Sequence, residues 1–235
     1  MSFTFSDVDV SNAENIAQHV EVPAMQNSPL YWTMFPRLDT ITETGREEIV
    51  RWYAEMLEDA FQDRWESFLK GCSDDGTPVG FCGWTIMERN KPQVEAKIGR
   101  TNRILKKATW LPEAIDIDSW IAVSKALRAE QDRVLKDVDN VCRKLIRIIV
   151  QQQPADGHLG LTFMAVNPSY QRQGIASMMM QRICEETDQY GRCAYVLAAP
   201  EGVPLYTKFG FQVVGCVETP QGMITSMLRP ARMTV

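Results

Sequence analysis

The segment 159–190 constrains the fold of this chain more than any other part of the sequence. Residues 159–166 form an apolar run of strand length, and residues 174–190 have the spacing of an amphipathic helix. A helix that begins just after a strand leaves unpaired backbone N–H groups at its positive end. Gly174 allows unusual dihedral angles there, and Arg172 adds a positive charge. The turn therefore predicts a phosphate-binding site, with a plain connection that happens to contain glycine as the alternative.

The rest of the pattern predicts further strands and helices on both sides of this segment. Three prolines make 21–37 a loop with at most one helical turn, because proline interrupts regular pairing. Strands are expected at 3–10, 65–71, 79–87, 193–198, 211–217 and 222–228, and helices at 11–19, 47–61 and 204–209.

A long excursion, about 88–155, interrupts the alternation of strands and helices. It opens with a strongly basic run between Arg89 and Lys107. A long helix is expected to follow, capped by Ser119. Its apolar positions form a seam that either packs back on its own domain or joins two copies in a homodimer. They are Trp120, Val123, Leu127, Val134, Val138, Val141, Leu145 and Ile148.

Composition limits the class of protein. The 235 residues suit one domain rather than two. We expect a cytoplasmic protein, with access to the nucleus left open, because the chain shows neither a secretory signal nor an apolar run that spans a membrane. The first 90 residues carry 6 Lys/Arg against 16 Asp/Glu, which argues against a nucleic-acid partner and suits a cationic substrate. Six scattered cysteines and two histidines predict neither a metal site nor a disulfide framework, so the thiols are expected to be reduced and mostly buried.

Two motifs resemble the GNAT (GCN5-related N-acetyltransferase) superfamily. Its signature Q/R-x-x-G-x-G/A is matched by Gln171, Gly174 and Ala176. An element similar to its L-Y-x-x-x-G-F follows at 205–211, in the same order and at the expected spacing. The resemblance implies one domain over 1–235, with a helical insertion at about 88–155 and an acetyl-CoA-binding core at about 157–217. The implied α/β (α+β) fold is a central mixed, mostly antiparallel sheet flanked by helices.

The resemblance also implies roles for particular residues. Backbone groups of the strand should pair with the pantetheine arm, and the turn should hold the pyrophosphate of acetyl-CoA, without a metal. Tyr206 should lie near the cofactor sulfur as the general acid. The expected cofactor-binding residues are Met164, Ala165, Val166, Gln171, Arg172, Gln173, Gly174, Ile175, Ala176 and Ser177.

The acceptor is less constrained than the cofactor. Ala194 stands where some relatives carry a catalytic glutamate, and Ala199 where many carry asparagine. Tyr31, Trp32 and Phe35, with Trp84 opposite, are candidates for an aromatic slot or for ordinary core packing.

The expected function is transfer of an acetyl group to the primary amine of a small molecule. The alternatives are a protein N-terminal or lysine acetyltransferase, and a CoA-binding module that has lost catalysis. The insertion is expected to cover the acceptor side of the site.

Overall fold

The computed structural model describes residues 2–87, 110–150 and 157–232, and the side chains of all these except 87 and 137–150. The basic run from Arg89 to Lys107 lies outside the described residues, and the last four positions of the apolar seam lie where only the backbone is described. Within them, no helix is both long and apolar enough to cross a membrane.

The core of the fold is a seven-stranded sheet in the order β1-β2-β3-β4-β5-β7-β6. Only the pair β4–β5 is parallel, and the other neighbouring pairs are antiparallel. The sheet confirms the predicted mixed, mostly antiparallel fold class. Its strands are β1 (Thr4–Asp7), β2 (Glu66–Cys72), β3 (Pro78–Met87), β4 (His158–Val166), β5 (Ala194–Ala198), β6 (Gln212–Thr219) and β7 (Gly222–Arg229).

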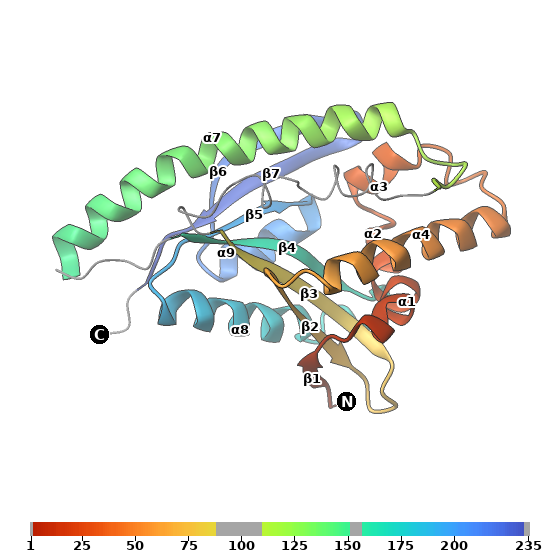
Figure 1. The fold of residues 1–235 in the computed structure, drawn as a ribbon, viewed down its shortest axis with the longest axis horizontal. Helices are drawn as coiled ribbons and strands as arrows, with labels where there is room; N and C mark the ends of the chain where they lie inside the picture. The colour runs from red at the N-terminus through yellow and green to blue at the C-terminus, as the bar shows by residue number, and fades with distance from the viewer. Residues whose placement is uncertain (1, 88–109, 151–156, 233–235) are drawn as a thin grey trace.

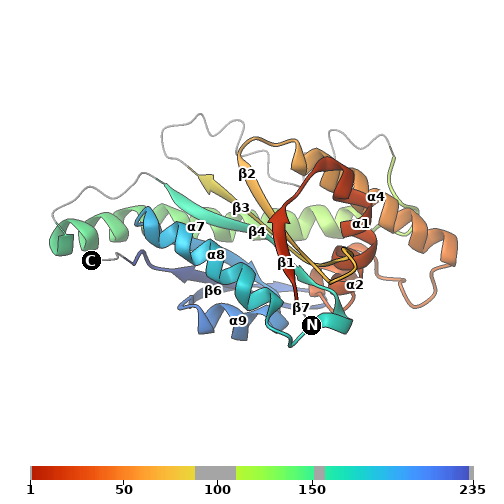
Figure 2. The ribbon, with the colours of Figure 1, turned by 90° about the horizontal axis from the view of Figure 1, so that it is seen from below.

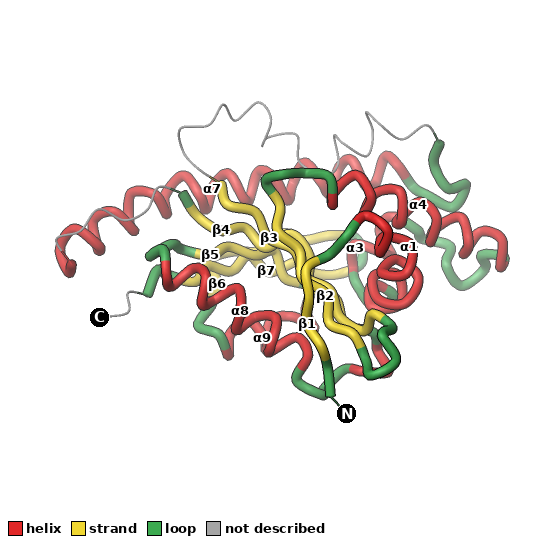
Figure 3. Tube along the Cα trace, turned by 60° about the horizontal axis from the view of Figure 1, so that its bottom comes forward, coloured by secondary structure: helices red, strands yellow, loops and turns green. Residues whose placement is uncertain are grey.

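Helices cover both faces of this sheet, and Figures 1 and 2 show the strands between α7 and α8. On one face, α8 and α9 pack over β3, β4 and β5. On the other, the helices from α1 to α4 pack over the β3–β4 half, and α7 packs over β5, β7 and β6 (Figure 3). The helices are α1 (Ala13–Ile16), α2 (Val22–Met25), α3 (Pro29–Met34), α4 (Glu43–Phe61), α7 (Ile117–Val150), α8 (Ile175–Gln189) and α9 (Val203–Lys208). Shorter helical turns are η1 (Val10–Asn12), η2 (Ala17–Glu21), η3 (Pro168–Tyr170) and η4 (Pro200–Gly202).

The N-terminal region differs from its predicted elements. β1 ends at Asp7 rather than at residue 10, because Asp9 and Asn12 form a capping box that starts η1. The expected loop 21–37 contains two helices. Ser28 caps α3 by accepting from the Leu30 N–H at 3.3 Å, and Pro29 stands in the first turn, where a missing N–H costs nothing.

The long helix α7 begins two residues before its predicted cap. Asp116, rather than Ser119, accepts at the N-terminus: its carboxylate takes the Ser119 N–H at 3.0 Å and the Ser119 hydroxyl at 2.9 Å. The described seam positions Val123 and Val134 are buried within the same chain. That part of the seam therefore packs on its own domain.

Most of the described thiols are free, as the sequence predicts, but one is not. Cys72, Cys82, Cys184 and Cys216 carry free thiols, whereas Cys193 is disulfide-bonded. The prediction of reduced thiols is wrong at Cys193, because linear spacing does not show which cysteines the fold brings together.

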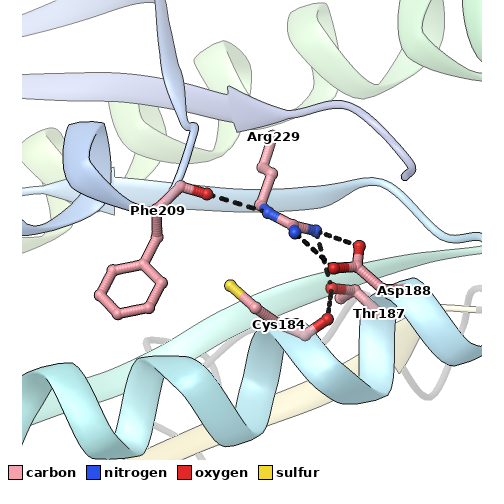
Figure 4. Close-up of polar contacts among 5 residues, drawn as sticks. All are labelled: Cys184, Thr187, Asp188, Phe209 and Arg229. Atoms are coloured by element: carbon pink, nitrogen blue, oxygen red, sulfur yellow. Dashed lines mark hydrogen bonds and ion pairs between the residues drawn. The ribbon is translucent and has the colours of Figure 1, made fainter. Parts of the chain in front are cut away.

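A buried ion pair joins the C-terminal end of α8 to β7 (Figure 4). The Arg229 guanidinium, on a residue that is 2% exposed, donates to both carboxylate oxygens of Asp188 at 2.7 Å. It also donates to the Thr187 hydroxyl and to the Phe209 carbonyl, each at 3.0 Å. All these donors therefore point at oxygen acceptors, which is the condition for a buried guanidinium to be tolerated.

Arg229→Ala is expected to lower the free energy of unfolding by about 3 kcal/mol, since it leaves Asp188 without its buried partner. Chemical denaturation measures the loss. The exposed pair of Arg51 and Glu55, at 3.5 Å, supplies the control: Arg51→Ala should cost less than about 1 kcal/mol. Equal losses in the two variants would contradict a structural role for the buried pair.

Candidate active site

The site begins where β4 and β5 separate. The two parallel strands pair at only two positions, Leu159 with Ala194 and Gly160 with Tyr195. β4 nevertheless continues to Val166 and β5 to Ala198. No other described strand pairs with β4 along this edge, so the outer part of β4 offers backbone groups to a ligand.

A bulge in β4 decides which backbone groups face this gap. The register with β3 skips Thr162, so side chains before and after it change faces. Leu161 and Met164 both pack on the α8 side of the sheet, whereas Phe163 packs on the other side. Simple alternation would place Leu161 and Phe163 on one face. Position 162 is therefore the extra residue.

Backbone hydrogen bonds give the same orientation. The Leu159 N–H donates toward β5, to the Cys193 carbonyl, and the Asn167 N–H donates toward β3, to the Val79 carbonyl, both at 2.9 Å. Counting back by twos from Asn167, Ala165 turns its backbone toward β3.

Met164 and Val166 consequently turn their backbones toward the gap. Of the Val166 groups, the carbonyl already accepts from the Gln171 side chain at 3.1 Å. The Met164 and Val166 N–H groups thus fit the predicted role toward pantetheine, and Ala165 does not lie in the gap.

The turn after β4 has the shape of an anion receptor. Arg172 adopts φ 63° and Gly174 φ 90°, both in the left-handed region. No side chain caps α8, so the N–H groups of Ile175, Ala176 and Ser177 have no acceptor within the helix. A Cβ atom on Gly174 would meet nothing within 4 Å, so the space next to the helix end is open. These residues fit a phosphate group.

Lys208 brings a second cation to this turn, and sequence reasoning missed it. Its ammonium lies 3.5 Å from the Ser177 hydroxyl, in the first turn of α8. The residue lies inside the quoted 205–211 motif, so the signal was present, but only the fold places α9 beside α8.

Tyr206 is buried beneath the gap. It is 5% exposed and belongs to the core cluster that also contains Cys82, Met164 and Val166, which are residues of β3 and β4. Burial raises the pKa of the Tyr206 phenol well above its ordinary value. The phenol is therefore protonated at neutral pH and able to donate a hydrogen bond.

The predicted aromatic slot does not form from all four residues. Tyr31 and Phe35 stack edge to face with a centroid distance of 5.2 Å and are buried beside α4. Trp32 donates its indole N–H to the Gln26 carbonyl at 2.7 Å. Trp84 lies on the opposite face of the sheet, where its indole N–H donates to Glu186 of α8 at 3.1 Å. The structure therefore separates Trp84 from the other three.

Glu21 is the one buried carboxylate among the described residues, at 5% exposure. It ends η2, a π-helical turn, and such turns occur often at functional sites. η2 packs against β3 and β4, and the Asn167 side chain at the end of β4 donates to the His19 carbonyl at 2.6 Å. A carboxylate thus lies in the segment next to the end of β4. The sequence shows only an acidic residue directly after the apolar Val20, which does not indicate that Glu21 becomes buried.

No group of three or more potential metal ligands forms within the described residues. The groups described above are backbone donors, two cations, a phenol and a carboxylate.

Comparison with known proteins agrees with a site for a phosphate-bearing cofactor such as acetyl-CoA. The family model for the acetyltransferase (GNAT) domain matches residues 132–213. A search of curated protein sequences finds no significant match. The part of the chain at 132–213 thus matches the GNAT acetyltransferase domain, and the fold agrees with that match, which supports an acyltransferase.

Solved structures with the same fold span nearly the whole chain. A histone acetyltransferase HPA2 and related acetyltransferase from Corynebacterium glutamicum gives a TM-score of 0.59 at 15% identity, covering 100% of this chain and 99% of that one. The arylalkylamine N-acetyltransferase 2 from Aedes aegypti gives 0.56 at 12% identity, with 98% and 99% covered. The PaiA N-acetyltransferase from Thermoplasma acidophilum, solved with coenzyme A, gives 0.50 at 12% identity, with 98% and 99% covered.

Gly174→Glu is expected to abolish the rise in melting temperature that acetyl-CoA causes, because a carboxylate would occupy the phosphate position. Differential scanning fluorimetry measures the shift. Gly76→Glu is a matched control, since Gly76 also has positive φ, at 85°, and open space around its Cβ position. A full ligand-induced shift in Gly174→Glu would show that the anion site is elsewhere.

Proposed function

We propose that this protein transfers the acetyl group of acetyl-CoA directly to the primary amine of a small molecule. The observation that carries the proposal is the placement of two receptors at one end of β4. The open edge of β4 suits the pantetheine arm, and the turn that directly follows it suits the pyrophosphate.

The chain's own groups suit direct transfer. Acetyl-CoA supplies an activated acetyl carbon, to which the neutral amine nitrogen bonds while the carbon–sulfur bond breaks. The amine gives up one proton and the CoA thiolate takes up one, so the products are the N-acetylated amine and the CoA thiol. The Met164 N–H is a donor on the gap side and is suited to stabilise negative charge on the acetyl oxygen. Tyr206 is suited to donate a hydrogen bond to the departing sulfur, because burial keeps its phenol protonated.

A protein substrate remains the second candidate. It is favoured by the likeness to the C. glutamicum structure, which is named as a histone acetyltransferase. Thiol release measured over small amines and over lysine and N-terminal peptides distinguishes the two. Binding of CoA without any thiol release would instead indicate a module without catalysis.

Tyr206→Phe is expected to lower kcat by about 10- to 100-fold while leaving the CoA-induced melting shift intact, since the departing sulfur loses a hydrogen bond to its developing negative charge. Steady-state kinetics under conditions where chemistry limits the rate measure the effect. Tyr195→Phe is the control: Tyr195 is a buried tyrosine whose hydroxyl contacts Ser226 at 3.1 Å. Its kcat should be unchanged. An unchanged kcat in Tyr206→Phe would limit Tyr206 to packing.

Glu21→Gln is expected to lower kcat/KM for a cationic amine by about tenfold or more, because the amine loses a buried carboxylate partner. The CoA-induced melting shift should stay the same. Glu14→Gln, an exposed change on neighbouring α1, should have no effect on either quantity. If the two variants had equal kcat/KM, Glu21 would have no role toward the acceptor.

A further inference from the structure

The helix α7 presents two different stripes to the rest of the chain. One stripe faces β6: Arg133 donates to the Val214 carbonyl at 2.9 Å and to Glu130 of its own helix. The seam residue Val134 packs next to it, against Tyr195 of β5. These contacts show which side of α7 faces β6 and β5.

The second stripe consists of hydrogen-bond donors. Trp120, Ser124 and Arg128 follow at intervals of four, so they lie in one row along the helix. At 100° per residue, Ser124 lies about 120° around the axis from Glu130 and so on the flank away from β6. Ser124 is 3% exposed, which shows that protein covers this flank.

Three polar atoms of this row lack a hydrogen-bond partner among the described residues. The Trp120 Nε1, the Ser124 Oγ and the Arg128 Nη1 atoms are all buried, and none has a hydrogen-bond partner there. Buried polar atoms are paired in the great majority of cases, so three in one row call for an explanation.

The surroundings connect the row with the acceptor side of the site. Trp120 packs against the core cluster that contains Tyr31 and Phe35, and α7 packs against α3. Trp52 of the same cluster has a fourth buried donor, its indole Nε1, for which the described part of the chain supplies no hydrogen-bond partner. Figure 1 shows the start of α7 next to α3, on the face of the sheet away from α8. The donors therefore lie on the face opposite the phosphate turn.

The chemistry of the donors limits what can satisfy them. An indole N–H and a guanidinium only donate hydrogen bonds, and a hydroxyl can donate as well. A partner must thus supply acceptor oxygens, and Arg128 selects an anionic group such as a carboxylate. A simple polyamine or monoamine offers no such oxygen.

We propose that this row recognises a carboxylate on the acceptor, so that the substrate is a small amine that also carries a carboxylate, such as an amino acid. The proposal rests on the N-acetyltransferase function proposed above and names its substrate class. Because the three atoms are covered by protein, the carboxylate reaches them only when α7 shifts from its contacts. Acceptor binding and movement of α7 are therefore coupled.

The test compares matched amines that differ only in the carboxylate: phenylalanine with phenethylamine, and lysine with cadaverine. The wild-type protein should prefer the carboxylate-bearing member of a pair by about 10- to 100-fold in kcat/KM, the range for a hydrogen bond to a charged group. In Arg128→Met this preference should fall to near unity. Lys125→Met, an exposed change on the same helix, should keep it.

Binding of the products separates this inference from the proposed function. Calorimetry with N-acetylphenylalanine and N-acetylphenethylamine needs no turnover, and the first should bind more tightly to wild type but not to Arg128→Met. Equal binding of both products by wild type, or a preference that survives in Arg128→Met, would overturn the proposal and assign the row to buried water. Absence of acetylation together with a carboxylate preference in binding would instead refute only the proposed function.

Discussion

The site depends on the early separation of β4 from β5. Parallel strands normally pair along their shared length, and each buried backbone group without a partner costs free energy. Here pairing stops after Gly160, and the extra residue Thr162 rotates the rest of β4. The unpaired edge is thus stable only because a ligand or water can satisfy it. Without the bulge, the Met164 backbone would face β3, and the gap would offer a different set of groups.

The two faces of the sheet carry different functional groups. The turn before α8, with Gly174 and Lys208, gathers positive charge on one face. The helices from α1 to α4 and α7 cover the other, where Glu21 and the donor row of α7 lie. The gap between β4 and β5 opens the sheet from one face to the other. A cofactor and an acceptor approaching from opposite sides would therefore meet without competing for the same entrance.

The sequence predicts what depends on local pattern and misses what depends on pairing. The periodicity of 159–190 and the two GNAT motifs locate β4, the turn, α8 and Tyr206 almost to the residue. The separation of Trp84 from Tyr31 and Phe35 was missed, because the sequence does not show which face of the sheet each helix covers. Glu21, Lys208 and the donors of α7 were missed for a related reason: their meaning comes from burial and neighbours, which arise only on folding.

The positive φ of Arg172 lowers the stability of the fold while it places a cation beside the proposed acetyl-CoA site. Arg172 holds φ at 63°, a conformation that costs a residue other than glycine about 1–2 kcal/mol. A glycine would remove this strain and, with it, a cation next to the anion receptor. Selection for heat tolerance and selection for cofactor affinity would consequently favour different residues at position 172. Variants evolved in the laboratory for a high melting temperature alone would drift toward weaker use of dilute acetyl-CoA.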